Sequence, residues 1–156
     1  MTQSRAMEAI AASGIEFDIT EHGPVSSLEE AAVARGMRPE QILKSIVVRR
    51  AAGDFLFVLV PGGRTISWPK LRALLGVSRL SMPSADEAQD VTGYARGTIT
   101  PFGSLTVLPV IADFAIPQRK VSIGGGAQAV AFTVDSGDLV QVLAAQVADV
   151  TELEST

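Results

Sequence analysis

The amino-acid sequence predicts an α/β fold with a mixed β-sheet. Segments with helix caps alternate along the chain with short apolar segments that are typical of strands. Several apolar segments follow one another across short turns, which favours hairpins over a doubly wound parallel sheet. The chain has 156 residues, within the usual range of about 100–200 for one domain, so we expect residues 1–156 to form a single domain.

The N-terminal segment predicts two helices separated by a short strand. The expected elements are a helix over 4–13 ended by Gly14, a strand over 17–20, and a helix over 28–35 ended by Gly36. Ser27 and Glu30 have the spacing of a capping box, in which each side chain accepts a hydrogen bond from the other residue's backbone N–H. This pattern identifies residue 27 as the start of the second helix.

The next segment predicts a hairpin between two helices. The expected elements are a short helix over 39–43, strands over 44–50 and 55–60, and a helix over 68–75. Pro39 suits the first turn of a helix, and residues 52–54 form the turn between the two strands. Ser67 is the expected cap of the helix that Gly76 ends.

The C-terminal half of the sequence predicts four further strands and two helices. The expected elements are a short strand near 78–82, a helix from a Ser84 capping box to Gly93, strands over 106–113, 120–125 and 129–134, and a helix over 136–146. The segment 93–103 contains three glycines and a proline, so we expect a shaped loop there.

The composition excludes several kinds of chemistry. The absence of cysteine excludes disulfides, thiolate metal sites, iron–sulfur clusters and cysteine nucleophiles. A single histidine, His22, argues against a His-rich metal site or a catalytic triad elsewhere in the chain. No apolar run reaches the ~18 residues of a membrane span, and no signal peptide is evident. We expect a cytoplasmic protein without membrane association, metal or other cofactor.

The charge is unevenly distributed along the chain. The formal net charge is −4, which by itself disfavours a nucleic-acid partner. Residues 35–79, however, hold nine basic and two acidic residues, a net charge of +7. This block is either a set of solvated faces or a surface for a polyanion.

A few residues are candidates for catalysis or ligand binding. Lys44 begins an apolar strand, where an ammonium could hold a carbonyl or phosphate oxygen, or simply extend into solvent. The glycine-rich loop could direct backbone amides at an oxyanion or serve only as a connector. His22 lies in a Gly-Pro turn and Asp135 most simply caps the last helix.

Taken together, these segments resemble the YbaK/ProX family, free-standing relatives of the editing domain inserted in bacterial prolyl-tRNA synthetases. The similar segments are EHGPVSSLEEAA, RGMRPEQILKSIVV, FLFVLVPGG, GYARGTITPFG, VIAD, VSIGGG and FTVDSGDLVQVL, which cover roughly residues 16–146. The lysine of Ile42–Ser45 and the GxxxP loop of Gly97–Pro101 are the most specific parts.

The resemblance implies a metal-independent trans-editing aminoacyl-tRNA deacylase with a compact α/β fold and a barrel-like sheet. Its substrate would be the ester of a mischarged tRNA carrying a small amino acid. It implies catalytic roles for Lys44 and Gly97. The positions that the resemblance assigns to substrate binding are Thr20, His22, Thr98, Pro101, Ser122, Gly124, Gly125 and Asp135. Some members have a tyrosine at the position of Thr20, so the edited amino acid stays open.

The expected partner is the acceptor end of an aminoacyl-tRNA, and whether a synthetase assists stays open. The side chains expected to face the tRNA are Arg49, Arg50, Arg64, Lys70 and Arg72. We expect a monomer. The alternative interpretation is a tRNA- or synthetase-associated binding module that has the same fold without catalysis.

Overall fold

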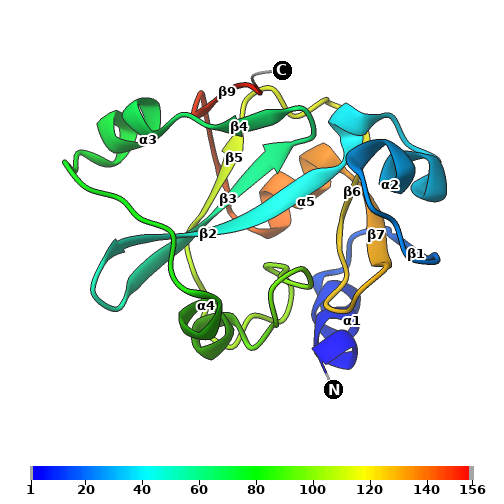
Figure 1. Cartoon of the computed structure of the whole chain (residues 1–156). Helices are drawn as coiled ribbons and strands as arrows, with labels where there is room; N and C mark the ends of the chain where they lie inside the picture. The colour runs from blue at the N-terminus through cyan, green and yellow to red at the C-terminus, as the bar shows by residue number, and fades with distance from the viewer. Residues whose placement is uncertain (1, 155–156) are drawn as a thin grey trace.

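A computed structural model describes residues 2–154 (Figure 1). The helices are α1 (Thr2–Ser13), α2 (Leu28–Arg35), the 3-10 helix η1 (Pro39–Gln41), α3 (Trp68–Leu75), α4 (Ala85–Thr92) and α5 (Ser136–Val142). The strands are β1 (Asp18–Glu21), β2 (Leu43–Ala51), β3 (Asp54–Pro61), β4 (Arg64–Ile66), β5 (Val110–Asp113), β6 (Lys120–Gly124), β7 (Val130–Asp135), β8 (Gln146–Ala148) and β9 (Thr151–Leu153).

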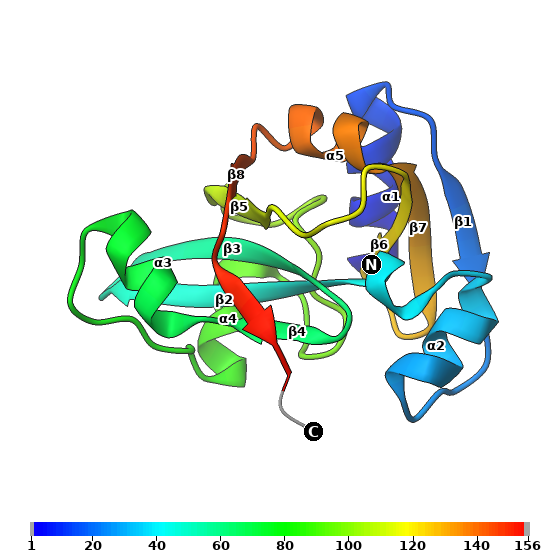
Figure 2. The same cartoon turned by 90° about the horizontal axis from the view of Figure 1, so that it is seen from above.

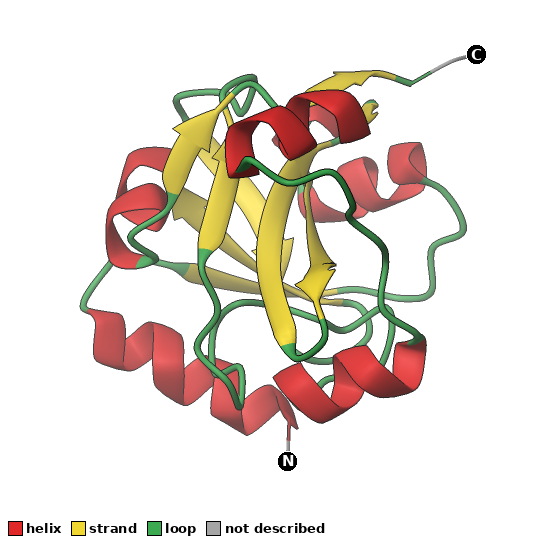
Figure 3. Ribbon diagram, turned by 90° about the vertical axis from the view of Figure 1, so that its left-hand side faces the viewer, coloured by secondary structure: helices red, strands yellow, loops and turns green. Residues whose placement is uncertain are grey.

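The strands form three sheets, with orders β1-β7-β6, β2-β3-β5-β8 and β4-β9. The four-stranded sheet is mixed, because β2 and β3 are antiparallel whereas β3, β5 and β8 are parallel. The two larger sheets lie side by side, with helices outside them (Figures 2 and 3). The predicted α/β class is confirmed. The described strands form no closed barrel, because the two larger sheets are joined by a single bridge, between Ile42 just before β2 and Ser122 of β6, instead of a continuous ladder.

The β2–β3 hairpin separates two hydrophobic clusters. Successive side chains of a strand point to opposite faces. Phe57 and Leu59 of β3 therefore pack into the cluster under β6 and β7, whereas Val58 and Val60 pack into the cluster with Leu71 of α3. Because both faces of β3 are covered, its sequence is a continuous apolar run rather than an alternating one.

The helix caps follow the predicted positions with two differences. The hydroxyls of Ser27 and Ser84 each accept the backbone N–H three residues later, at 3.1 Å. The Glu30 carboxylate, however, accepts the N–H of Ser26 instead of Ser27, at 2.7 Å. Ser67 occupies the cap position of α3 without a side-chain cap bond. Its buried backbone N–H instead donates to Val150 O, which fastens α3 to the C-terminal segment.

The short strands are where the structure differs most from expectation. β4, β8 and β9 were not predicted, and the expected strand near 78–82 is reduced to a bridge between Ser81 and Arg49. The last helix ends at Val142 instead of residue 146, because the chain turns at Ala144 (φ 50°) into β8. These strands have three residues each and depend on pairing with distant segments. Local sequence patterns do not encode that pairing.

Candidate functional site

A cavity of about 630 Å³ lies along the open edge of β2. β2 is the outermost strand of its sheet. The other walls come from Arg35, the segment 82–85, the loop at 96–99, and Gly124 at the end of β6. Segments from four distant parts of the sequence therefore meet at one strand edge.

The backbone of β2 is itself a wall of this cavity. Gly62 N–H donates to Ile42 O across the hairpin, whereas Arg49 exchanges both backbone hydrogen bonds with Ser81 on the opposite edge. Because these directions alternate along a strand, Ser45 and Val47 point their N–H and C=O groups to the open edge. Within residues 2–154, no strand pairs with β2 there between the bridges at 42 and 49. The Ser45 hydroxyl oxygen is also buried, without a hydrogen-bond partner in this part of the chain.

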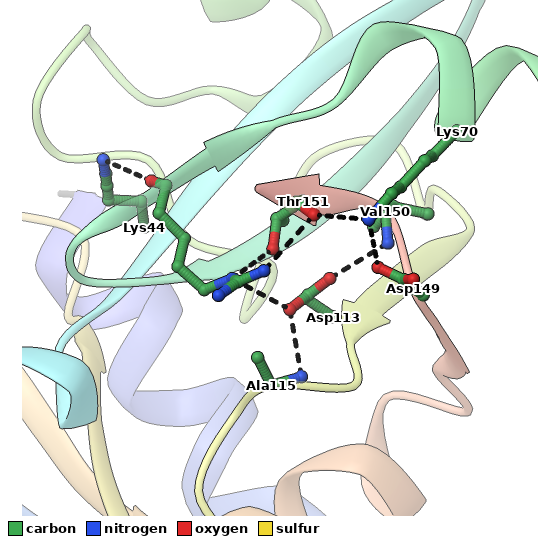
Figure 4. Close-up of polar contacts among 8 residues, drawn as sticks. Lys44, Lys70, Asp113, Ala115, Asp149, Val150 and Thr151 are labelled. Carbon is green, nitrogen blue, oxygen red and sulfur yellow. Dashed lines mark hydrogen bonds and ion pairs between the residues drawn. The ribbon is translucent and has the colours of Figure 1, made fainter. Parts of the chain in front are cut away.

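Lys44 lies at the rim of the cavity. Its side chain shares the face of β2 with Ile46 and Val48, as the alternation predicts. Its Nζ lies 3.1 Å from Glu154 Oε1. It also lies 3.4 Å from Arg64 O of β4, which is the Lys44 contact drawn in Figure 4. The Lys44 and Glu154 side chains are 44% and 48% exposed, so this is an ion pair that solvent can separate.

The GxxxP loop forms the wall opposite β2. Gly97 (φ 89°) and Ile99 line the cavity, whereas Thr98 and Pro101 do not. Thr98 is turned back on the loop, because its N–H and hydroxyl both donate to Ala95 O. The left-handed conformation of Gly97 requires glycine, so this position is set by backbone geometry.

A buried anchor that the sequence analysis missed holds both ends of this loop. Tyr94 is fully buried, and its hydroxyl donates to Phe102 O at 2.6 Å. The Arg5 guanidinium lies over the Tyr94 ring at 4.7 Å and donates to Gly93 O and Gly103 O. Burial raises the pKa of Tyr94, although Arg5 partly opposes this. The N-terminal helix thus fixes the shape of the loop.

The glycine-rich end of β6 approaches the GxxxP loop closely. A Cβ on Gly124 would lie 3.3 Å from Ile99 O, so only a residue without a side chain fits there without adjustment. Gly125 lies outside the cavity lining and makes the hairpin turn to β7, where its N–H donates to Val130 O. Ser122 is buried, and its hydroxyl accepts a hydrogen bond from Arg35.

Besides Thr98, Pro101, Ser122 and Gly125, three more predicted substrate-binding residues lie outside the cavity lining. Thr20 is on β1, opposite Ala131 of β7. Asp135 is the N-cap of α5 and accepts the N–H of Asp138 at 3.1 Å. His22 joins the site indirectly, because its Nε2 lies 3.4 Å from Arg35 Nε.

Arg35 is one of the cavity residues to which the sequence analysis gave no functional role. It is the last residue of α2, where a cation is usually explained by the helix dipole. Burial lowers the pKa of Arg35. Ser45 and Arg96 also line the cavity, and the sequence analysis gave them no role although both stand in segments that carry the family resemblance.

The predicted tRNA-facing residues divide into two groups. Arg49, Arg50 and Arg72 line a second hollow of about 480 Å³ together with Arg79. In contrast, Arg64 donates to Thr151 and lies 3.9 Å from the buried Asp113, and Lys70 bonds to Asp149 (Figure 4). Arg49 and Arg50 of the hollow also pair with carboxylates, those of Glu87 and Asp54. Arg64 and Lys70 tie β4 and α3 to the C-terminal segment.

Residues 2–154 contain neither a membrane-spanning helix nor a cluster of metal ligands. No helix in that range is long and apolar enough to cross a membrane. The same residues contain no group of three or more His, Cys, Asp or Glu side chains that could hold a metal ion.

The fold and the site together define a compact α/β domain with a cavity that is lined by three cations and bordered by a glycine loop. A profile of the family described as the aminoacyl-tRNA editing domain matches residues 22–142, and the chain belongs to this family. This confirms the family assignment made from the sequence and supports the predicted editing function.

Individual relatives agree with this assignment. The chain is 32% identical to the proline–tRNA ligase of Bacillus licheniformis over 105 residues, and 31% identical to that of Kosmotoga olearia over 110 residues. These alignments cover 67% and 70% of this chain but only 18% and 19% of the ligases. A crystal structure of a candidate trans-editing enzyme for prolyl tRNA synthetase superposes with a TM-score of 0.87 at 28% identity, covering 97% of both chains.

Proposed function

We propose that this protein is a trans-editing deacylase that hydrolyses the ester of a tRNA charged with the wrong small amino acid. The observation that carries the proposal is the cavity itself. Three cations, Arg35, Lys44 and Arg96, line it, and no Asp or Glu of the described residues does. Such a cavity suits the anionic end of an aminoacyl-tRNA, and the family match supplies the reaction.

The proposed ester hydrolysis uses backbone amides and a substrate hydroxyl, and it requires no side chain as nucleophile or general base. Water adds to the ester carbonyl carbon, and the carbonyl oxygen becomes an oxyanion that loop amides near Gly97 would stabilise. Collapse breaks the bond to the ribose oxygen, which takes a proton and leaves the free amino acid and the tRNA hydroxyl. The lining contains no His or carboxylate to serve as base, so the neighbouring ribose hydroxyl is the proposed group that orients the water.

Lys44 would hold the phosphate or the ester carbonyl after its ammonium exchanges Glu154 for the substrate. Both partners are about half exposed, so this exchange costs little. The unpartnered Ser45 hydroxyl and the outward groups of β2 would then receive the amino-acid moiety. The proposed substrate, a charged tRNA, is consistent with the expected cytoplasmic location.

The test is a deacylation screen with purified protein and tRNAs charged separately with Ala, Cys, Ser, Thr and Pro. We expect the wild type to release at least one amino acid, and Lys44→Ala to reduce that rate at least tenfold while circular dichroism stays unchanged. Lys120→Ala is the matched control, because Lys120 is exposed and does not line the cavity. Full activity of Lys44→Ala on every substrate would contradict the role of the lysine.

The alternative is a binding module with the same fold. Such a protein would retain charged tRNA without releasing the amino acid, so the same screen combined with a filter-binding measurement separates the two. The GxxxP loop, held in shape by a buried anchor, favours the enzyme, because a module that only binds tRNA has no need of an oxyanion site.

A further inference from the structure

Arg35 is held in the cavity by neutral groups alone. Its Nη1 donates to Ser122 Oγ at 3.1 Å, and its Nε lies 3.4 Å from His22 Nε2. His22 Nδ1 lies 2.8 Å from Gly23 O, and a carbonyl only accepts, so Nδ1 carries the hydrogen. In the tautomer with this hydrogen on Nδ1, His22 Nε2 accepts the hydrogen bond from Arg35 Nε.

This arrangement leaves the charge of Arg35 uncompensated. The ion pairs found within residues 2–154 include Arg38, Arg49, Arg50 and Arg64, but not Arg35. A guanidinium has five N–H donors, and two are used here, so three remain for a ligand. Burial of an unpaired cation is unfavourable, as the lowered pKa of Arg35 also indicates.

The position of Arg35 indicates which part of a ligand it meets. It lies on the β6 side of the cavity, where Ser122 is two residues from Gly124, and Gly124 closely approaches the GxxxP loop at Ile99. A group bound by Arg35 therefore lies in the same cavity as the GxxxP loop. Arg96, exposed and lining the same cavity, adds positive charge near that loop.

We infer that Arg35, fixed by Ser122 and His22, binds the phosphate of the terminal nucleotide, which leaves the ester carbonyl as the group that Lys44 holds. The inference rests on the proposed function for the identity of the ligand. An aminoacyl ester has no free carboxylate and its amino group is cationic, so the phosphate is the anion that this end of the substrate offers. The planar guanidinium fork matches phosphate oxygens in a bidentate way.

The experiment compares two ligands that differ only in the phosphate. Adenosine 5′-monophosphate and adenosine are titrated calorimetrically into the wild type, Arg35→Gln and Arg38→Gln. We expect the wild type to bind the monophosphate at least tenfold more tightly than adenosine. Arg35→Gln should lose about tenfold to a hundredfold in affinity for the monophosphate, as removal of a hydrogen bond to a charged group predicts, with adenosine unchanged.

Arg38→Gln is the matched control. Arg38 is three residues away, its side chain is 71% exposed, it pairs with Glu40, and it does not line the cavity. It should bind both ligands as the wild type does. Equal binding of both ligands by the wild type, or undiminished binding of the monophosphate by Arg35→Gln, would overturn the inference.

A second variant covers the case in which Arg35→Gln does not fold. Ser122→Ala removes one of the two acceptors that orient the guanidinium. It should therefore weaken binding of the monophosphate but not of adenosine, and unchanged binding of the monophosphate would overturn the inference. With uncharged tRNA, loss of one phosphate contact should reduce the slope of log affinity against log salt by about 0.7 for a single strand.

These binding readouts do not depend on catalysis. If the wild type binds the monophosphate through Arg35 but releases no amino acid, the phosphate site stands and the proposed deacylation fails. If deacylation occurs and Arg35→Gln changes neither KM nor binding, the phosphate site fails alone. In an active enzyme we expect Arg35→Gln to raise KM by more than it lowers kcat.

Discussion

Removing the hydroxyl of Tyr94 should weaken both the fold and the proposed catalytic loop. In Tyr94→Phe the ring stays, so the Arg5 contact over it is retained, but the 2.6 Å hydrogen bond to Phe102 O is lost. Phe102 is buried, and a buried group without its partner costs about 1–3 kcal/mol. For a domain of this size that corresponds to a decrease in Tm of about 2–12 °C.

The assay is thermal or urea unfolding followed by the fluorescence of Trp68, the only tryptophan in the chain. Ser104→Ala is the matched control, because its hydroxyl also donates to a carbonyl, Thr106 O, but in an exposed position. The control should change stability by no more than about 0.5 kcal/mol. A Tm of Tyr94→Phe equal to that of the wild type would refute the proposed anchoring of the loop.

The same variant has a pH signature whose sign follows from the burial of Tyr94. Its pKa in the folded state is raised above the ordinary value of 10.0, so the folded state holds the proton more tightly than the unfolded state. The resulting stability is complete below pH 10.0 and is lost as the pH rises through the folded pKa. The stability difference between wild type and Tyr94→Phe should therefore shrink above that pH, and a difference that grows would contradict this reasoning.

Two further predictions concern charged residues around the site. Glu154→Gln should release the Lys44 ammonium: we expect the free energy of unfolding to change by less than about 1 kcal/mol, and kcat/KM for deacylation to rise by up to about fivefold. A loss of activity as large as that of Lys44→Ala would instead place Glu154 in the reaction. Charge reversal at Arg72, which lines the arginine hollow, should weaken tRNA binding and lower its salt dependence more than reversal at Lys70, which is bonded to Asp149. Equal effects in a filter-binding titration would show that the hollow is not the preferred contact.

Much of the fold could be predicted because its signals are local. The hydroxyls of Ser27 and Ser84 cap their helices, and Gly36, Gly76 and Gly93 end theirs in the left-handed conformation, as their spacing indicates. The β2–β3 hairpin likewise follows from two apolar runs across a short turn. Each of these features depends on neighbours within a few residues.

The site was only partly predictable, because its contacts join distant positions. Lys44 and Gly97 were found through the resemblance, and both line the cavity. Asp135, assigned to substrate binding by the same resemblance, is a helix cap, and Thr98 donates back to its own loop. The roles proposed for Lys44 and Gly97 are predictions that the deacylation assays above test.

The amino-acid sequence by itself determined the α/β class, the order of the long elements, the glycine loop and the basic block at 35–79. Only the tertiary structure decided which of those cations share a cavity. Arg35 and Ser122 are 87 positions apart, and Arg5 reaches the loop across a separation of 98. The physical reason is that a cation can bind an anionic ligand only if no carboxylate of the protein already neutralises it. Tertiary packing decides which cations are neutralised in this way. Arg49, Arg50 and Arg64 each form an ion pair with a carboxylate, whereas Arg35 contacts His22 and Ser122 instead.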